Sequence, residues 1–452
     1  MSSSESNSSN TNPFLSSSSS DGELQAYYNQ WQSTCQQLQQ AVQQGGDNAQ
    51  PESSRRRRRR THIERGREQG HSQLYKDYFS EIATYPDEVF RRRFRMRKPL
   101  FIRIVEQLEG GMQFFQQRPD ATGRLGISAL QKCTSVMRIL AYGIAADACD
   151  EYLRLSGGLA RQSLLHFVEG VITYFGDEYL RRPTSADIDR LLSVGASRGF
   201  PGMLGSIDCM HWGWKNCPTV WKGQFARGDH KMPTIILEAV ASYDLWIWHA
   251  FFGVPGTCND INVLDRSPVF DDVLNDIAPN VKFTVNGHEY NMGYYLTDGI
   301  YPDWATFIQS ITKPQGPKAK LFAEKQESTR KDVERAFGVL QARFAIVRKP
   351  ALSWDPVTIG KIMRACIILH NMIVEDERDN YTHHGYEIPR FDEGVSGEPT
   401  PVDESDFAFS TIRPDVMRSF IRTRIQLRDR GTHHRLKEDL KEHIWERFGG
   451  ES

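Results

Sequence analysis

The sequence predicts an α/β protein in which a strand-rich segment carrying isolated acids follows a helical region. Three apolar runs of the β type follow one another at Leu204–Trp212, Thr234–Tyr243 and Trp246–Val254. Before them, over Ser72–Pro183, the apolar residues recur at helical intervals. We therefore expect a mixed sheet with flanking helices, preceded by an all-helical region.

The composition indicates an intracellular protein with an uneven distribution of charge. The chain has 452 residues and a formal net charge of −1. Between Arg55 and Arg103 it carries sixteen Lys and Arg against six Asp and Glu, whereas Asp376–Asp406 is acidic. Its seven cysteines are widely spaced and fit a reducing compartment. Because its apolar runs are too short for a membrane span or a signal peptide, we expect neither.

Changes in composition divide the chain into five expected segments. Residues 1–70 form a disordered Ser- and Gln-rich tail that ends in an arginine-rich arm. Residues 71–199 form the helical region and residues 200–377 the strand-rich core. An acidic linker spans 378–412, and a helix over 413–452 either folds back onto the core or mediates dimerisation.

Three carboxylates in the core are candidates for one site. Asp208 lies in the first strand, Asp298 follows a short strand at Gly293–Thr297, and Glu334 lies in the helical stretch Ser328–Arg343. A buried acid needs a partner, because an unpaired buried charge is costly. Mg²⁺ or Mn²⁺ prefers oxygen ligands, and two such ions held by carboxylates catalyse phosphoryl transfer. The three acids therefore predict a two-metal site.

Two of these assignments have simpler alternatives. Asp260 competes with Asp298 for the role of the second carboxylate. Because it stands where a helix begins, N-capping explains it. The other interpretation is a supporting role near the metal ions. Glu334 follows Arg330 by four residues, so the two side chains could form an ordinary helix salt bridge.

Several motifs resemble those of a known family. They are G-S-I-D-C-M-H-W, P-G-T-C-N-D-I-N-V-L, L-T-D-G-I-Y-P, V-E-R-A-F-G-V-L-Q-A-R-F and I-L-H-N-M-I-V-E-D, in this order along the chain. The sequence is similar to PIF/Harbinger DDE transposases, particularly the plant Pong/Ping-like branch, from about residue 70 onward. This resemblance implies an RNase H-like nuclease core, with the DDE triad at Asp208, Asp298 and Glu334.

The resemblance also implies a mechanism and partners. A water would cleave DNA at the terminal repeats of the element, and the freed 3′-hydroxyl would attack target DNA, with two Mg²⁺ or Mn²⁺ ions per site. The family implies a Myb/SANT-like accessory protein encoded by the same element. We expect a nuclear protein that forms a homodimer or a larger assembly.

Basic residues outside the acid site are candidates for contacts with DNA. A run of six arginines indicates a nuclear-import signal, a phosphate-binding arm or a merely solvated segment. Helices expected at Ser128–Tyr142, Ala145–Leu153 and Leu159–Phe175 have the outline of a helix-turn-helix, which any small helical domain can also show. The candidate contacts are Arg55, Arg56, Arg57, Arg58, Arg59, Arg60, Arg154, Arg161, Lys318, Lys320, Arg330 and Lys331.

Two further stretches bear on binding. Tryptophans and lysines alternate after the first strand, which suits either a nucleic-acid contact or a packed loop; they include Trp212, Trp214, Lys215, Trp221 and Lys222. Lys313–Lys325 is expected to be a Pro/Gly loop rich in lysine.

Two other functions remain open. One is a host protein derived from such a transposase, which serves as a chromatin or DNA-binding adaptor without cleavage. The other is a repair nuclease with the same fold. The intact triad favours the transposase, although a recent domestication would also retain these acids.

Overall fold

A computed structural model describes residues 63–228, 232–274, 281–378 and 423–451. Residues 65–452 form one compact unit, and the following account concerns that unit. The run of six arginines and almost all of the acidic linker lie outside the described residues.

The first part of the unit is helical, as the sequence predicts. The helices are α2 (Arg67–Tyr78), α3 (Asp87–Phe94), α4 (Lys98–Gly111), α5 (Ala129–Tyr142), η1 (Ala146–Cys149), α6 (Asp150–Leu153), α7 (Gly157–Tyr179) and α8 (Ser185–Ser197). Ser128 caps α5, which confirms the helix start expected there, and Thr184 caps α8; each does so through a reciprocal capping box. The expected middle helix of the trio is only a 3₁₀ turn followed by the single turn of α6.

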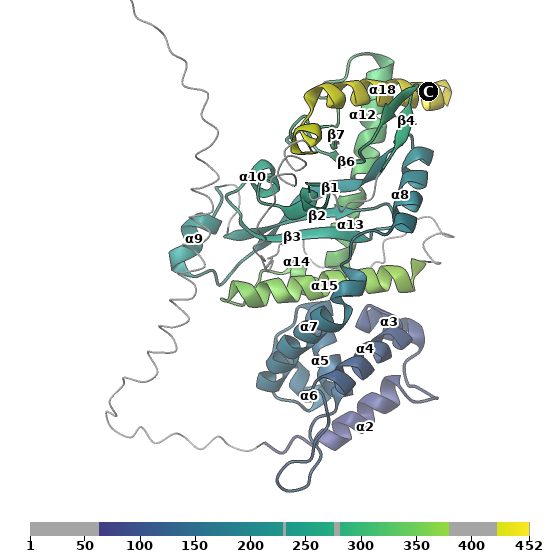
Figure 1. The fold of residues 1–452 in the computed structure, drawn as a ribbon. Coiled ribbons are helices and arrows are strands. Elements are labelled where there is room, and N and C mark those ends of the chain that lie inside the picture. The colour runs from purple at the N-terminus through teal and green to yellow at the C-terminus, as the bar shows by residue number, and fades with distance from the viewer. Residues whose placement is uncertain (1–62, 229–231, 275–280, 379–422, 452) are drawn as a thin grey trace, which may run out of the picture. The chain divides into compact units, whose positions relative to one another are not determined.

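A five-stranded mixed sheet follows, with the strand order β3-β2-β1-β6-β7. The strands are β1 (Met203–Gly213), β2 (Thr234–Ala241), β3 (Ile247–Pro255), β6 (Tyr294–Thr297) and β7 (Phe307–Gln309). β1, β2 and β3 are antiparallel neighbours, whereas β1, β6 and β7 run parallel. The three consecutive strands and the short strand before Asp298 are therefore confirmed (Figure 1).

The remaining elements surround this sheet or extend it. They are α9 (Thr219–Phe225), α10 (Asp260–Leu264), η2 (Pro268–Phe270), α11 (Asp271–Leu274), β4 (Phe283–Val285), β5 (His288–Tyr290), α12 (Gly316–Arg330), α13 (Asp332–Arg343), α14 (Ala345–Arg348), α15 (Pro356–Asp376), α18 (Arg430–Phe448) and η3 (Gly449–Glu451). β4 and β5 form a separate hairpin.

Two local predictions in this part are wrong. Most of Lys313–Lys325 is helical, because Pro317 stands in the first turn of α12, where its missing N–H costs nothing. The single helix expected over Ser328–Arg343 is divided at Lys331 into α12 and α13. The division accompanies the complete burial of Asp332, whose carboxylate pairs with Arg198 of α8 and Arg335 of α13.

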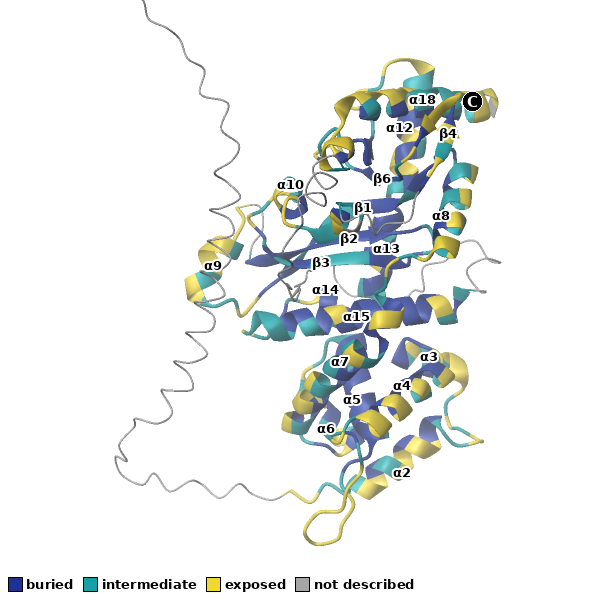
Figure 2. Ribbon diagram, in the orientation of Figure 1, coloured by how far each residue is buried: buried dark blue, intermediate teal, exposed yellow. Residues whose placement is uncertain are grey.

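One continuous core joins the helical part to the sheet. It extends from α2 through α7 to the inner faces of β1, β2 and β3, and includes most of α15. α15 packs on α7, β3 and α13 (Figures 1 and 2). The C-terminal helix α18 packs on α12, β4 and β7 through Leu436, Leu440 and Ile444. Of the two alternatives for this helix, the structure therefore shows folding back onto the core.

Polar side chains in the middle of α15 are fully satisfied. Asn371 accepts a hydrogen bond from the backbone N–H of Ile247 at 2.9 Å and donates to the carbonyls of Tyr179 and Ile247. His370 accepts from Arg343 through Nδ1 at 3.2 Å, so its Nε2 carries the proton that it donates to the carbonyl of Leu245 at 2.9 Å. These residues thus tie α15 to both α7 and the sheet.

By length and composition, α15 is the one helix in the described part of the chain that could cross a membrane. However, 78% of its most apolar window is buried inside the protein. Its apolar character is therefore explained by its position in the core.

Burial and the charge of Arg343 lower the pKa of His370 to about 3. Because the unfolded side chain takes up a proton near pH 6.5, stability is lost as the pH falls from 6.5 towards 3. We expect this histidine to lower the free energy of unfolding by about 2 kcal/mol between pH 7 and pH 5. Urea unfolding of the wild type and of His370→Gln measures this change. The variant should be less stable at pH 7 and show a smaller loss at pH 5; an equal loss in both proteins would contradict the assignment.

Candidate functional site

Parallel pairing of β1 and β6 brings Asp208 and Asp298 together. Ser206 pairs with Leu296 in this ladder, and Asp208 and Asp298 each follow two residues later. Side chains two residues apart on a strand share a face, so both carboxyl groups lie on the same side of the sheet. The same face of β1 contacts α13, which carries Glu334. The fold therefore brings the three predicted acids to one region.

Arg330 connects two of the three acids. Its Nη1 lies 3.2 Å from Oδ2 of Asp208, and its Nη2 lies 2.8 Å from Oε1 of Glu334. The arginine is the last residue of α12, and only 16% of its side chain is exposed. The helix salt bridge that the spacing of Arg330 and Glu334 suggests does form, but the contact with Asp208 adds a third partner. Among the DNA-contact candidates, Arg330 is thus directed at carboxylates.

The carboxyl group of Asp208 is partly buried. Burial raises the pKa of Asp208 to about 7, and the neighbouring charges of Asp298 and Asp260 act in the same direction. A hydrogen bond of 2.8 Å from the backbone N–H of Cys209 and the guanidinium of Arg330 oppose this increase. A carboxyl group that exchanges its proton near neutral pH is a common property of functional sites.

Asp260 is not the cap of its helix. Asn259 caps α10 in a reciprocal capping box with Asn262, and Asp260 occupies the first helical position. Burial and the charge of Asp298 raise the pKa of Asp260, whereas a hydrogen bond with Cys209 lowers it. The capping interpretation is therefore wrong for Asp260 itself, and the structure places its carboxyl group beside the other acids.

A fifth acid, Glu238, lies close to this cluster and is not among the predicted site residues. It is fully buried on β2, directly opposite Cys209 in the ladder. The hydroxyl of Ser267 donates to its Oε1, and Nε2 of His249 lies 3.4 Å from the same oxygen. The isolated glutamate in the apolar run T-I-I-L-E-A-V-A was the available signal in the sequence.

The acids suit a divalent cation by chemical type, because carboxylate oxygens are the ligands that Mg²⁺ and Mn²⁺ prefer. As they are arranged here, no group of three or more His, Cys, Asp or Glu side chains in the described residues could hold a metal ion. Arg330 instead supplies positive charge between Asp208 and Glu334. Binding of a metal ion therefore requires this guanidinium to turn away from at least one of the two acids.

The other DNA-contact candidates have different surroundings. Arg154 and Arg161 are exposed on the helical part, and Lys320 and Lys331 are exposed on α12 and at its end. Lys318 pairs with Glu442 of α18 at 2.5 Å, which ties the two helices together. Exposure makes the first four accessible to phosphate but does not test whether DNA binds there.

The tryptophans after β1 are packed. Trp212 and Trp214 are buried, and their ring nitrogens donate to the carbonyls of Lys349 and Ser353 at 2.6 and 2.8 Å. Trp221 packs against Trp214. For these rings the structure shows a packed loop, whereas Lys215 and Lys222 remain exposed.

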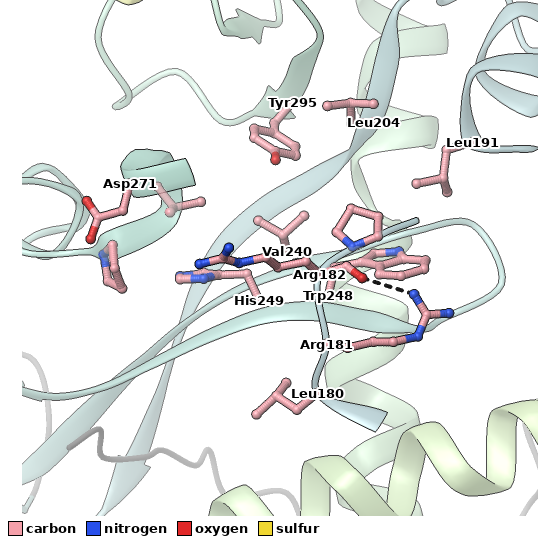
Figure 3. A pocket seen from close by; sticks show the side chains of 13 residues that line it. Leu180, Arg181, Arg182, Leu191, Leu204, Val240, Trp248, His249, Asp271 and Tyr295 are labelled. Carbon is pink, nitrogen blue, oxygen red and sulfur yellow. Dashed lines mark hydrogen bonds between the residues drawn. The ribbon is translucent and has the colours of Figure 1, made fainter. Parts of the chain in front are cut away.

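A pocket of about 300 Å³ lies on the other face of the sheet (Figure 3). Val240 lines it and pairs with Ile207, the neighbour of Asp208, so the two faces are opposite. Arg181 at its wall already pairs with Asp187 at 2.6 Å and lies over the ring of Trp248. The pocket contains none of the predicted acids.

Comparison with known families finds a match over the strand-rich part of the chain. Residues 177–381, which are 205 of the 452 residues, match a family described as plant transposon protein. This segment of the chain is therefore similar to plant transposon proteins. The matched segment includes Asp208, Asp298 and Glu334. Residues 70–109 match a domain of unknown function. Neither curated proteins nor solved structures include a match to this transposon-related chain.

The raised pKa of Asp208 has a consequence for stability. An acid whose pKa is higher in the folded than in the unfolded protein destabilises the fold, and this loss grows from the unfolded pKa near 4 and is complete above the folded pKa of about 7. We expect Asp208→Asn to stabilise the metal-free protein by about 1–3 kcal/mol at pH 8. Urea unfolding in the presence of EDTA measures the change.

The gain should be smaller at pH 5, where Asp208 is protonated in the folded protein and only the ionisation of the unfolded side chain still costs stability. Asp189→Asn, at an exposed position on α8, is the matched control and should change stability little at either pH. A destabilised Asp208→Asn protein at pH 8 would show that the contact with Arg330 outweighs the cost of burial.

Proposed function

We propose that this protein is a metal-dependent DNA transposase of the PIF/Harbinger type, which cleaves transposon ends and joins the 3′-hydroxyl to target DNA. The observation that supports the proposal most is the convergence of Asp208, Asp298 and Glu334 from two neighbouring strands and a helix. The match to plant transposon proteins covers all three. The mixed sheet with flanking helices supports the proposal of an RNase H-like core.

In this proposal the three acids hold two Mg²⁺ or Mn²⁺ ions, with Asp260 in support. The ions supply Lewis acidity that activates a water or hydroxyl and neutralises the charge of the phosphate. Asp208 lies on β1 and Asp298 directly follows β6, whereas Glu334 on α13 is more exposed, with 43% of its side chain accessible. Arg330 balances the acids before binding and becomes available to the phosphate backbone when it turns away.

The partners and location also belong to the proposal. The DNA ligands are the terminal repeats and the target, and a Myb/SANT-like protein of the same element assists their recognition. The protein acts in the nucleus as a homodimer or a larger assembly, with the arginine run serving nuclear import. A domesticated adaptor without cleavage is the second candidate, and the ion pairs of Arg330 with two triad acids favour it.

Cleavage of the terminal repeats of the element tests the enzyme and the site together. We expect strand cleavage that requires Mg²⁺ or Mn²⁺, and a loss of at least a hundredfold in Asp298→Asn, because the variant removes a charged ligand. The assay uses labelled DNA, with and without the Myb-like partner.

Asp189→Asn again serves as the matched control and should cleave like the wild type. DNA binding without cleavage under all these conditions would contradict the transposase and support the adaptor.

Binding of the metal ion should depend on pH. A carboxyl ligand must lose its proton, and burial raises the pKa of Asp208 to about 7. We expect the affinity for Mn²⁺ to increase about tenfold from pH 6 to pH 8, as for competition with a single proton of that pKa. Calorimetric titration measures it. Asp208→Asn should bind more weakly and lose most of this dependence; an equal dependence in both proteins would assign the proton to another group.

A further inference from the structure

One large aromatic side chain of the described chain stands out by its exposure. Trp354 lies in the loop between α14 and α15, and 72% of it is accessible. Leu352 in the same loop is 64% exposed, and Val220 on nearby α9 is 88% exposed. Burying a tryptophan usually contributes substantial free energy, so a ligand that covers this ring would gain affinity from it.

The loop that carries Trp354 is held firmly at the end of β1. The backbone N–H of Lys215 donates to the carbonyl of Ala351 at 3.1 Å, and the side-chain amide of Asn216 donates to the carbonyl of Leu352 at 2.7 Å. Trp214 donates to the carbonyl of Ser353. The exposed ring therefore projects from a fixed backbone, next to the segment that carries Lys215 and leads into α9.

The chain segment that holds the Trp354 loop, and α9 after it, carry two exposed lysines. Lys215 and Lys222 are exposed, and α9 has no buried residue (Figure 2). Asp355 is the acid next to Trp354, but its carboxylate caps α15 by accepting from the N–H groups of Val357 and Thr358. The surface thus combines an aromatic face with two lysines, the combination that suits single nucleic-acid strands.

The position of this surface relative to the acids suits one DNA strand. The part of β1 from Asp208 to its end at Gly213 is about 17 Å long at the usual rise per residue. Trp354 follows just beyond this end of the strand, because the ring of Trp214 holds the carbonyl of Ser353, the preceding residue. A strand of about six nucleotides reaches from the acids to the ring.

We propose that Trp354, flanked by Lys215 and Lys222, is a stacking site for an unpaired base of the DNA strand whose phosphate lies at the acid cluster. This inference rests on the proposed function for the identity of the ligand. The lysines hold the phosphates on either side of the stacked base. Charge complementarity favours DNA over a protein partner, because a purely apolar interface would leave both lysines desolvated or at its rim.

Binding of fluorescent oligonucleotides to the full-length protein tests the proposal. The assay uses anisotropy in EDTA, so that cleavage does not contribute, and compares a blunt duplex with one that has six unpaired nucleotides at one end. We expect Trp354→Ala to weaken binding of the second DNA about tenfold and of the blunt duplex much less. Trp354→Phe should restore most of the affinity, because it keeps an aromatic face.

Two matched controls separate this site from general effects. Tyr75→Ala removes an exposed aromatic residue on α2, and Lys282→Gln removes an exposed lysine elsewhere; neither should change binding. A double variant, Lys215→Gln with Lys222→Gln, removes two contacts with phosphate. In this variant the slope of log affinity against log salt concentration should be smaller by one to two.

Equal affinities of Trp354→Ala and the wild type for the tailed duplex would overturn the proposal. A change in the sedimentation of the Trp354→Ala protein, together with unchanged DNA affinity, would also overturn the proposal. That result would identify a protein interface. Cleavage by the wild type keeps the outcomes distinct: a wild-type protein that does not cleave the terminal repeats but shows Trp354-dependent binding contradicts the transposase and not the stacking site.

Discussion

The mutual repulsion of the carboxyl groups that β1, the end of β6 and the start of α10 bring together is the constraint on which this site depends. Asp208, Asp260 and Asp298 act on one another through their charges in a place with limited access to water. Such a cluster is stable only if protons or a cation balance it. Arg330 provides part of that balance, and the raised pKa of Asp208 provides another part. The need for positive charge that shapes the resting site is the same property that suits it to metal ions and phosphate.

The rigidity of this site comes from the way the sheet is connected to the helical part. Asn371 and His370 bond to backbone groups of β3, α7 and the β2–β3 connection, so α15 cannot slide without breaking buried hydrogen bonds. Asp332 does the same between α8 and α13, and thereby sets where the helix that carries Glu334 begins. The position of a candidate catalytic acid is thus determined by polar contacts in the core as well as by apolar packing.

The end of β1 combines two roles. Trp212 and Trp214 are buried there and hold the loop before α15 through their ring nitrogens. This packing leaves Trp354 with its ring exposed beside Lys215. Buried aromatic residues therefore support the loop, and the neighbouring exposed ring is the one that we propose stacks on a DNA base. The sequence shows that tryptophans and lysines alternate here, but only the structure shows which rings are in contact with solvent.

The sequence by itself determined the features that depend on neighbouring residues. Alternation and apolar runs predicted β1, β2 and β3, and the caps at Ser128 and Thr184 were visible as local motifs. Tertiary structure decided the contact of Arg330 with Asp208, the orientation of Asp260 and the break before α13. These depend on groups brought together from distant parts of the chain, such as the 122 positions between Asp208 and Arg330. Local sequence patterns do not predict such pairs, because burial and charge balance arise only when the elements pack.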